Sequence, residues 1–520
     1  MSTAKKTVKT AGIIMIITLM SKILGFGREV VIGSRFGTTH MVDAYNMAQN
    51  IPMVLFAAIG LAIATTVIPI FSEYLTKEGK DKAYDFVNNL LSIMLLITAC
   101  FTIAGIGVSP YIVRLMAPGF EGNVFLLTVR LTMILFPVTI LIAISNILTA
   151  SLQSMEHFTV PAMIGIPYNI IIIGTVIIFS SRFGILGVAV ATVIAALTQV
   201  LIQLPILYKL GFKFRFKVNF KDEAVKRVII LSIPVLIGTG MQVINTYVDR
   251  MIASYLPEGS ISALNYANRL NGFALGIFST AIVTVIYPSL SRSSALNNTK
   301  SFLRWLNFSI KAIIYVMLPV TVCAIVLRVP IIRLLFERGA FDERSTYLTS
   351  IGLMFFSIGI TASGLRDVLS RGFYSLKDTK TPMYNGGIAV IINIILNLIL
   401  VRYMQLGGLA LSTSVAAIVT TFMLFISLRR KIGKIGGKEI INTFVKASSA
   451  SFLMGIMIYY LFRELSKVMP DGKLYEAINL FGTIVSGVAL YSLIILICDR
   501  TALRYLKVGL KYINSKLAGN

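Results

Sequence analysis

Fourteen apolar segments, each long enough to cross a lipid bilayer, follow one another along the 520-residue chain. About 20 apolar residues in a helix span the hydrocarbon core of a membrane. Hydrophobic residues make up 56% of the sequence and charged residues 13%, which is too little polar surface for a water-soluble protein of this size. We therefore expect an all-α polytopic membrane protein with fourteen transmembrane helices and no sizeable soluble domain. The expected spans are 10–33, 46–73, 86–110, 125–150, 160–180, 185–208, 228–255, 262–289, 304–327, 346–371, 384–401, 406–428, 443–462 and 477–498.

Basic residues are unevenly divided between the two sets of connecting loops. The set that includes both termini holds 29 lysines and arginines, and the opposite set holds 11. Loops on the cytoplasmic side of a membrane carry the excess of basic residues, so both termini are predicted to be cytoplasmic. The net charge of +26 then reflects topology and attraction to anionic lipids, and no nucleic-acid partner is expected.

The first twelve predicted helices contain an internal repeat with a period near 220 residues. Residues 43–72 align without a gap to residues 262–291, and a shift of 221 pairs Pro161 with Pro382. Six spans return the chain to its starting side, so the two lobes share one orientation, and such parallel repeats are typical of transporters with a substrate site between the lobes. We expect two pseudo-symmetric six-helix lobes at 1–215 and 216–432, with the last two helices and a basic tail at 433–520.

Cationic side chains fall deep inside several predicted spans. A charge at the centre of a span costs roughly 2.5–3.5 kcal/mol, so such a side chain should face a cavity or a partner. Between Lys22 and Arg28, Gly25 and Gly27 allow a bend or an unwound turn, and Glu29 can neutralise part of the charge. Internal ion pairs and interhelical hydrogen bonds are the purely structural alternatives. We predict a hydrated substrate cavity lined by Lys22, Arg28, Glu29, Asn50, Asn265, Arg269 and Arg366.

The sign of these charges indicates the substrate class. Arginine binds phosphate oxygens through two parallel hydrogen bonds and lysine adds a point charge, so the cavity should favour a phosphorylated anion. An exporter of lipophilic cations would need the opposite charge. A catalytic or metal centre is not expected, because His40 and His157 are the only histidines and no cysteines stand at CxxC spacing.

A second polar set offers oxygen ligands for a coupling cation. Asp249 lies deep in its span and can instead pair with Arg250, whereas two asparagines share a helix face at i, i+4. Coupling to Na⁺ or H⁺, or to the membrane potential acting on charged side chains, is compatible with these residues. The cation site would comprise Asp249, Asn393, Asn397 and Thr413.

Several short stretches occur in a characteristic order and spacing over nearly the whole chain. They are Lys22–Glu29 with Phe36-Gly37 and Asp43–Tyr45, Ala117–Phe120, Gly184–Pro205, Tyr266–Leu270 followed by Tyr287–Arg292, and Arg371–Pro382. Together they resemble the MurJ (MviN) family of lipid II flippases, within the multidrug/oligosaccharidyl-lipid/polysaccharide exporter superfamily.

That resemblance implies a function. The protein would carry lipid II, the undecaprenyl-pyrophosphate-linked disaccharide-pentapeptide, from the inner to the outer leaflet of the bacterial cytoplasmic membrane by alternating access, for peptidoglycan synthesis. Lys22, Arg28 and Arg269 take the family's essential cation positions, Asp43 matches the acidic residue of the outer gate, and the last two helices form a groove for the lipid tail. Membrane lipids and cell-wall synthesis proteins are the other implied partners.

Two departures from the family pattern keep an alternative open. Residues 56–63 carry no charge where many members have a basic pair and a Glu-Gly step, and Asn268 stands where an aspartate is usual. A flippase for another polyprenyl-linked glycan, of the O-antigen, capsule or teichoic type, is the alternative. A cation-coupled multidrug exporter is disfavoured by the basic cavity, and an enzyme by the lack of a catalytic set on the loops.

Overall fold

The computed structural model describes residues 3–499, except for the side chains of 3–11, 54–62, 64, 234–235, 237–239 and 241–242. The side chains of the uncharged stretch at 56–62 and the basic tail from Arg500 onward lie outside the described residues.

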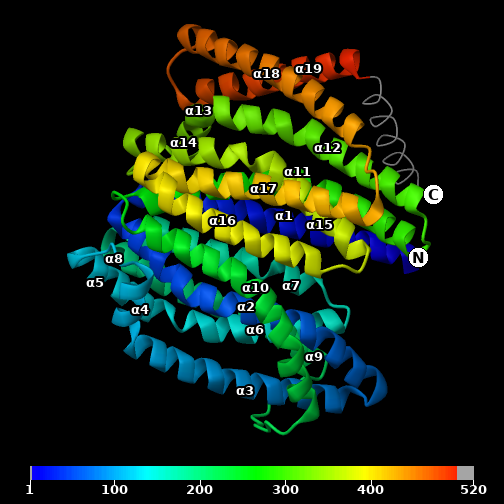
Figure 1. Cartoon of the computed structure of the whole chain (residues 1–520). Coiled ribbons are helices and arrows are strands. Elements are labelled where there is room, and N and C mark those ends of the chain that lie inside the picture. The colour runs from blue at the N-terminus through cyan, green and yellow to red at the C-terminus, as the bar shows by residue number, and fades with distance from the viewer. Residues whose placement is uncertain (1–2, 500–520) are drawn as a thin grey trace. The chain divides into compact units, whose positions relative to one another are not determined.

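Within this range the chain forms nineteen helices and no strand (Figure 1). Helix is the expected outcome, because a segment that crosses hydrocarbon must satisfy every backbone N–H and C=O within itself. The helices are α1 (Thr3–Phe36), α2 (His40–Lys77), α3 (Lys80–Gly107), α4 (Ser109–Met116), α5 (Gly122–Leu135), α6 (Val138–Ser154), α7 (Thr159–Met163), α8 (Gly165–Leu201), α9 (Leu204–Lys209), α10 (Glu223–Ala253), α11 (Ser260–Ala295), α12 (Thr299–Val326), α13 (Arg328–Phe336), α14 (Glu343–Ile358), α15 (Ile360–Ser375), α16 (Lys380–Met404), α17 (Leu406–Ile432), α18 (Gly437–Val468) and α19 (Lys473–Cys498).

The predicted spans coincide with this helical structure. Each of the fourteen apolar segments falls almost wholly on one helix or on two successive helices. Among the described residues, nine helical segments are long and apolar enough to cross a membrane. The count becomes ten when α14 and α15, which meet at a bend of 42°, are taken as one span. The all-helical, multi-pass class is therefore confirmed at this coarser level.

The internal repeat reappears in the backbone. Gly184, inside α8, has φ 54° and ψ −148°, and Gln405, between α16 and α17, has φ 48° and ψ −125°. These two positions are separated by 221 residues, the shift found in the sequence. Glycine adopts this conformation without the steric cost that a β-carbon imposes on Gln405. Glu156 and Lys377, again 221 apart, both have positive φ, 62° and 59°, so the same chain reversals recur in both repeats.

Contacts divide the described chain into two compact units. Unit 1 contains residues up to Ala263 together with Arg338–Ser345, and unit 2 contains Leu264–Glu337 and the residues from Thr346 onward. Helix α10 groups with unit 1 because it packs along α2. The repeat instead assigns these residues to the start of the second lobe, so the contact units and the predicted lobes at 1–215 and 216–432 have different boundaries.

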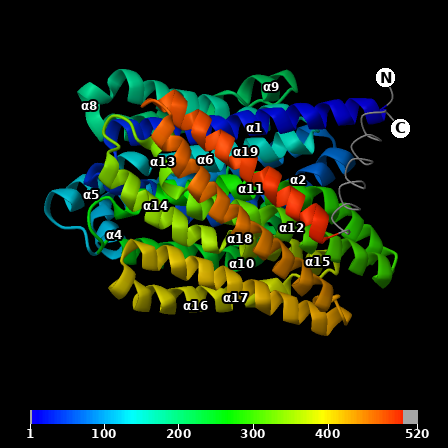
Figure 2. The ribbon, with the colours of Figure 1, turned by 90° about the horizontal axis from the view of Figure 1, so that it is seen from above.

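In unit 1, a core forms where α2, α3 and α6 meet. Its largest buried side chains are aromatic, with Phe71 and Phe86 almost fully enclosed and Leu148 packed beside them. In unit 2, α16 and α17 lie side by side, as both views show (Figures 1 and 2).

The last two helices attach to unit 2 through α12. Helix α18 packs on α12 and α19 packs on α18, at a distance so close that a β-carbon on Gly487 would lie 2.4 Å from the Ile458 side chain. Small residues allow this approach, which favours helix association inside a membrane. The Lys311 ammonium, buried in α12, pairs with Glu439 of α18 at 2.7 Å.

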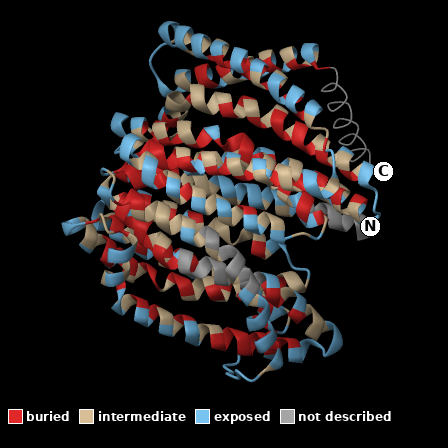
Figure 3. Ribbon diagram, viewed as in Figure 1, coloured by how far each residue is buried: buried red, intermediate tan, exposed pale blue. Residues whose placement is uncertain are grey.

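Exposed side chains along these two helices are largely apolar. Figure 3 shows exposed residues running along α18 and α19, and Phe452, Phe481 and Ile497 among them are 64% to 72% exposed. Large apolar side chains on a helix of span length are stable in contact with lipid, not with water.

Candidate functional site

Arg28 forms the best defined polar cluster inside α1. Its guanidinium donates one hydrogen bond to Glu29 Oε1 at 2.7 Å and another to Asn169 Oδ1 of α8 at 3.1 Å. The guanidinium also lies 5.6 Å from the ring centre of Tyr168, within range of a cation–π interaction. The Arg28 and Glu29 side chains are only 12% and 8% exposed. Arg28 is therefore held in one orientation by partners on two helices.

Lys22 lies on the same helix in a different setting. Its side chain is exposed, and α1 continues as regular helix through Gly25 and Gly27. The unwound turn that these glycines allow is therefore not formed. The reason is that the backbone hydrogen bonds of a long apolar helix outweigh the propensity cost of two glycines, about 1 kcal/mol each.

Helix α2 contributes amide side chains to unit 1. Asn50 is half-buried and donates to the backbone carbonyl of Asn46 at 2.6 Å. One turn earlier, the buried Tyr45 hydroxyl bonds Thr192 Oγ1 of α8 at 2.8 Å. Arg28 and Tyr45 therefore both bind α8, which joins the polar residues of α1 and α2 within one unit.

The remaining cavity residues lie in unit 2. On α11, Asn265 is half-buried and Arg269, one turn further, is exposed. Arg366 on α15 is also exposed. Its neighbour Asp367 was missed by the sequence reasoning, and it accepts a hydrogen bond from Ser279 of α11 at 3.4 Å. Adjacency to an intramembrane arginine was the available signal for this residue.

Asp43, near the start of α2, binds the turn at the start of α11, within unit 1. Its two carboxylate oxygens accept hydrogen bonds from the backbone N–H groups of Gly259 and Ser262, both at 2.7 Å. Ser262 is the repeat equivalent of Asp43, so the starts of two related helices, α2 and α11, meet here. Only the start of α2 has a carboxylate at this position. We call Asp43 with residues 257–262 the Asp43 clamp.

A neighbouring pair supports the Asp43 clamp. The His40 backbone N–H and ring Nδ1 approach Glu258 Oε1 at 2.8 and 3.0 Å. The hydrogen bond from this backbone N–H holds the pKa of Glu258 below its usual range.

The predicted cation site is divided between the two units. Asp249 is in unit 1 on α10 and accepts a hydrogen bond from Asn245 at 3.4 Å. In unit 2, the buried Asn393 and Asn397 share a face of α16, as predicted, and are hydrogen-bonded to each other at 3.0 Å. Thr413 of α17 donates to the Leu409 carbonyl at 3.1 Å. The use of these four residues as one site stays a prediction.

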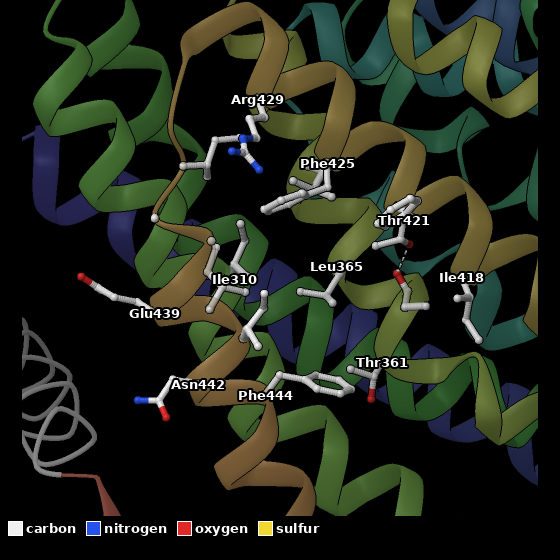
Figure 4. A pocket seen from close by; sticks show the side chains of 18 of the residues that line it. Ile310, Thr361, Leu365, Ile418, Thr421, Phe425, Arg429, Glu439, Asn442 and Phe444 are labelled. Carbon is white, nitrogen blue, oxygen red and sulfur yellow. Dashed lines mark hydrogen bonds between the residues drawn. The ribbon is translucent and has the colours of Figure 1, made fainter.

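Unit 2 also contains an apolar cavity of about 1760 Å³ that is open on one side and lined mainly by α12, α15, α17 and α18 (Figure 4). Phe425, Leu365 and Phe444 point into it, and Arg429 stands at one end beside the α17–α18 connection. Two of the wall hydroxyls, Thr321 and Thr361, are hydrogen-bonded to each other at 3.0 Å. The wall is thus mostly hydrocarbon, with charged residues, Glu439 as well as Arg429, near the α17–α18 connection, and such a wall suits a lipid chain.

Helices repeated in the same order, with arginines inside predicted spans and a large apolar cavity, are features of a multi-pass membrane transporter. A solved structure shares this fold. The inward-facing form of a multidrug resistance MATE family transporter of the MOP superfamily superposes with a TM-score of 0.69 at 14% identity, covering 82% of this chain and 98% of that one.

The chain belongs to the lipid II flippase MurJ family, whose model matches residues 32–470. A probable lipid II flippase MurJ from Rhizobium tropici is 31% identical over 489 residues, covering 91% of this chain and 90% of the relative. One from Rickettsia prowazekii is 30% identical over 495 residues, covering 93% and 96%. A solved lipid II flippase MurJ in an inward closed conformation is 27% identical, with a TM-score of 0.80 over 94% of this chain and 99% of that one.

Proposed function

We propose that this protein moves lipid II from the inner to the outer leaflet of the bacterial cytoplasmic membrane. The family match carries this conclusion, because it spans both repeats and reaches into α18. Movement of a lipid-linked precursor needs a polar site for the headgroup and an apolar path for the tail, and the described residues offer both kinds of surface.

The headgroup is bound by the cations inside the predicted spans. Lipid II carries a pyrophosphate, whose oxygens match the two-pronged donors of arginine. The guanidinium of Arg28 is held in one position, but its charge is partly neutralised by the ion pair with Glu29. Lys22, Arg269 and Arg366 are exposed and add positive charge to the predicted spans. Asn50 and Asn265 add amide donors for the sugar and peptide.

The tail is accommodated beside α18. The apolar cavity of unit 2 is bounded by this helix, one of the two that the family resemblance assigns to tail binding. Its wall hydroxyls satisfy each other or a backbone carbonyl, as Thr421 does with Ala362 at 2.8 Å. An isoprenoid chain therefore meets wall hydroxyls that already have a hydrogen-bond partner and lose none on contact.

Alternating access completes the cycle. Fourteen crossings with both termini cytoplasmic would let the site load from the cytoplasmic side, and the recurrence of Gly184 at Gln405 supports two equivalent halves that can move. Asp43 acts in this cycle as the outer gate, because its bonds to the turn at 257–262 must open and re-form. A cation held by Asp249, Asn393, Asn397 and Thr413, or the membrane potential, supplies the driving force.

The test is transport of defined substrates by the purified protein in liposomes. Lipid II labelled on its peptide should reach the opposite leaflet, where a membrane-impermeant reagent consumes it, whereas a polyprenyl-pyrophosphate O-antigen unit should stay in place. Movement of the O-antigen unit alone would transfer the assignment to another lipid-linked glycan. Movement of neither substrate, by a protein that also fails to replace the resident flippase in depleted bacteria, would overturn the proposal.

A further inference from the structure

The connection between α9 and α10 in unit 1 has an unusual amphipathic sequence. Residues 212–221 read Phe-Lys-Phe-Arg-Phe-Lys-Val-Asn-Phe-Lys, so apolar and polar residues alternate without a break. No helix or strand forms here. In extended backbone, side chains two residues apart lie on the same face, so this pattern separates an apolar face from a cationic face.

Buried polar side chains of α3 hold this connection in an extended form. Asn88 donates to the Lys213 carbonyl at 3.0 Å and accepts from the Arg215 N–H at 3.1 Å. Ser92 accepts from the Lys217 N–H at 3.0 Å. The bonded backbone groups belong to every second residue, which is the pattern of an extended segment. Successive side chains of such a segment point to opposite faces.

The ends of the segment are fixed as well. Asn89 exchanges two hydrogen bonds with the Asn219 backbone, at 2.7 and 3.0 Å. Before the segment, Phe212 is buried and its ring meets that of Tyr84 edge-on at 5.5 Å. After it, Asp222 caps α10 through the Ala224 N–H at 2.8 Å. We call residues 213–221 the strap; Figure 1 shows it beside α3 at the edge of unit 1.

The two faces of the strap are exposed and chemically distinct. Phe214, Phe216 and Phe220 are 48%, 62% and 55% exposed. The exposed basic residues occupy the alternate positions, namely Lys213, Arg215, Lys217 and Lys221. Asp85 of α3 pairs with Lys217 at 3.0 Å, and the other three cations are available to an external anion. Three exposed phenylalanines on one short segment are too apolar for a surface in contact with water alone.

The position along α3 identifies what covers this face. The first turn of α3 is charged, with Lys80, Asp81 and Lys82 exposed. Large exposed apolar residues begin at Leu96 and Ile97, one turn after Ser92. The strap therefore lies between the charged end of α3 and its lipid-facing part, the depth at which aromatic and basic side chains anchor to a membrane interface.

We propose that the strap is an interfacial anchor for an anionic lipid surface. Phe214, Phe216 and Phe220 insert among the acyl chains, while Lys213, Arg215 and Lys221 bind phosphate groups of anionic lipids. By the predicted topology this is the cytoplasmic leaflet. The anchor joins the end of the first repeat to the bilayer, and it does not depend on which substrate is carried.

The experiment uses tryptophan fluorescence in the full-length protein. Trp305 is the only tryptophan, so Trp305→Phe gives a silent background. In that background Phe216→Trp and Arg215→Trp place the probe at adjacent positions of opposite parity. The proteins are reconstituted into bilayers of phosphatidylcholine and phosphatidylglycerol with brominated acyl chains, which quench tryptophan only on contact.

The proposal expects most of the fluorescence to be lost with Phe216→Trp and little with Arg215→Trp. Absence of quenching at both positions, as a protein-binding surface would give in a pure lipid membrane, would overturn it. Equal quenching at both would also overturn it, since the two faces would then not differ.

A second arm tests the headgroup contact. Quenching of Phe216→Trp should rise with the fraction of phosphatidylglycerol, and the added changes Lys213→Gln, Arg215→Gln and Lys221→Gln should remove that dependence. If the parent shows no such dependence, binding of anionic headgroups is refuted. An unchanged melting temperature shows that each variant is folded.

Discussion

Arg28 in unit 1 and Arg269 in unit 2 are both arginines inside predicted spans, yet they differ in how far their side chains are exposed. Arg28 is 12% exposed and is held by Glu29, Asn169 and the Tyr168 ring. Arg269 is exposed, one turn from the half-buried Asn265. An intramembrane charge therefore does not define a single role. A buried, paired arginine stabilises and orients a cluster, whereas an exposed one can move toward a ligand.

The largest effect is expected for Arg269→Ala. Transport should fall to background while the amount of folded protein in the membrane is unchanged, because the lost side chain is exposed and supplies charge for the headgroup. The measurement is outer-leaflet lipid II in bacteria depleted of their resident flippase. Arg304→Ala, at an exposed arginine of α12, is the matched control and should be active. Normal transport by Arg269→Ala would abolish the contrast with Arg28.

Arg28→Ala should reduce both stability and transport. It leaves the nearly buried Glu29 carboxylate without its guanidinium, and breaking a buried pair costs about 3–5 kcal/mol. Arg28→Lys keeps the charge but cannot bind Glu29 and Asn169 with the same geometry. Its stability and transport should therefore lie between those of the parent and those of Arg28→Ala. Thermal unfolding in detergent, read beside the transport assay, separates these effects. A melting temperature for Arg28→Ala equal to that of the parent would refute the bracing role.

Asp43→Ala should loosen the Asp43 clamp. The carboxylate accepts two backbone N–H bonds at 2.7 Å, and each bond to a charged group contributes about 1.5–3 kcal/mol. Hydrogen exchange in peptides covering residues 257–263 should become faster. Glu258→Gln changes a half-exposed pair with His40, worth about 0–1 kcal/mol, and should change exchange far less. Equal protection in both variants would show that Asp43 does not hold this turn.

Lys22→Arg should leave transport close to normal, and Lys22→Gln should reduce it several-fold. Lys22 is exposed, as Arg269 is, so positive charge should matter more than side-chain shape. The comparison is made in the same depletion assay at matched protein levels. Loss of activity in Lys22→Arg would instead place Lys22 with Arg28, among the side chains whose geometry is fixed.

The smallest effect is expected for Asp378→Asn, in the turn before α16. The equivalent turn of the first repeat, before α7, has His157 at this position. The hydrogen bond from the Lys431 ammonium lowers the pKa of Asp378 to about 2. A lowered pKa means that this carboxylate adds stability above its unfolded value near 3.9, and that the stability is lost as the pH falls toward 2. Asp378→Asn should therefore lower the melting temperature slightly and equally from pH 8 to pH 5. A difference that disappears near pH 6 would contradict this assignment.

Much of the fold could be predicted because its signals are local. Apolar runs of span length specify helices, since hydrocarbon offers the backbone no other partner. The 221-residue shift between prolines makes Gly184 and Gln405 equivalent, and their dihedral angles match. The shared helical face of Asn393 and Asn397 followed from their spacing alone. Gly25 and Gly27 would allow an unwound turn, but the helix continues through them, because propensity is a weaker local signal than the need for hydrogen bonds in a membrane.

For the candidate site, the sequence predicted the charged residues but not their partners in the fold. The sequence by itself determined which residues are charged within the spans, the order of the helices, the repeat and the family pattern, because these depend on neighbours along the chain. Only the tertiary structure decided that Arg28 is enclosed by α8, that Asp43 meets its own repeat partner Ser262, and that Asn88 and Asn89 clamp the strap. Such pairings join residues more than a hundred positions apart, and the packing of whole helices selects them from many chemically equivalent partners.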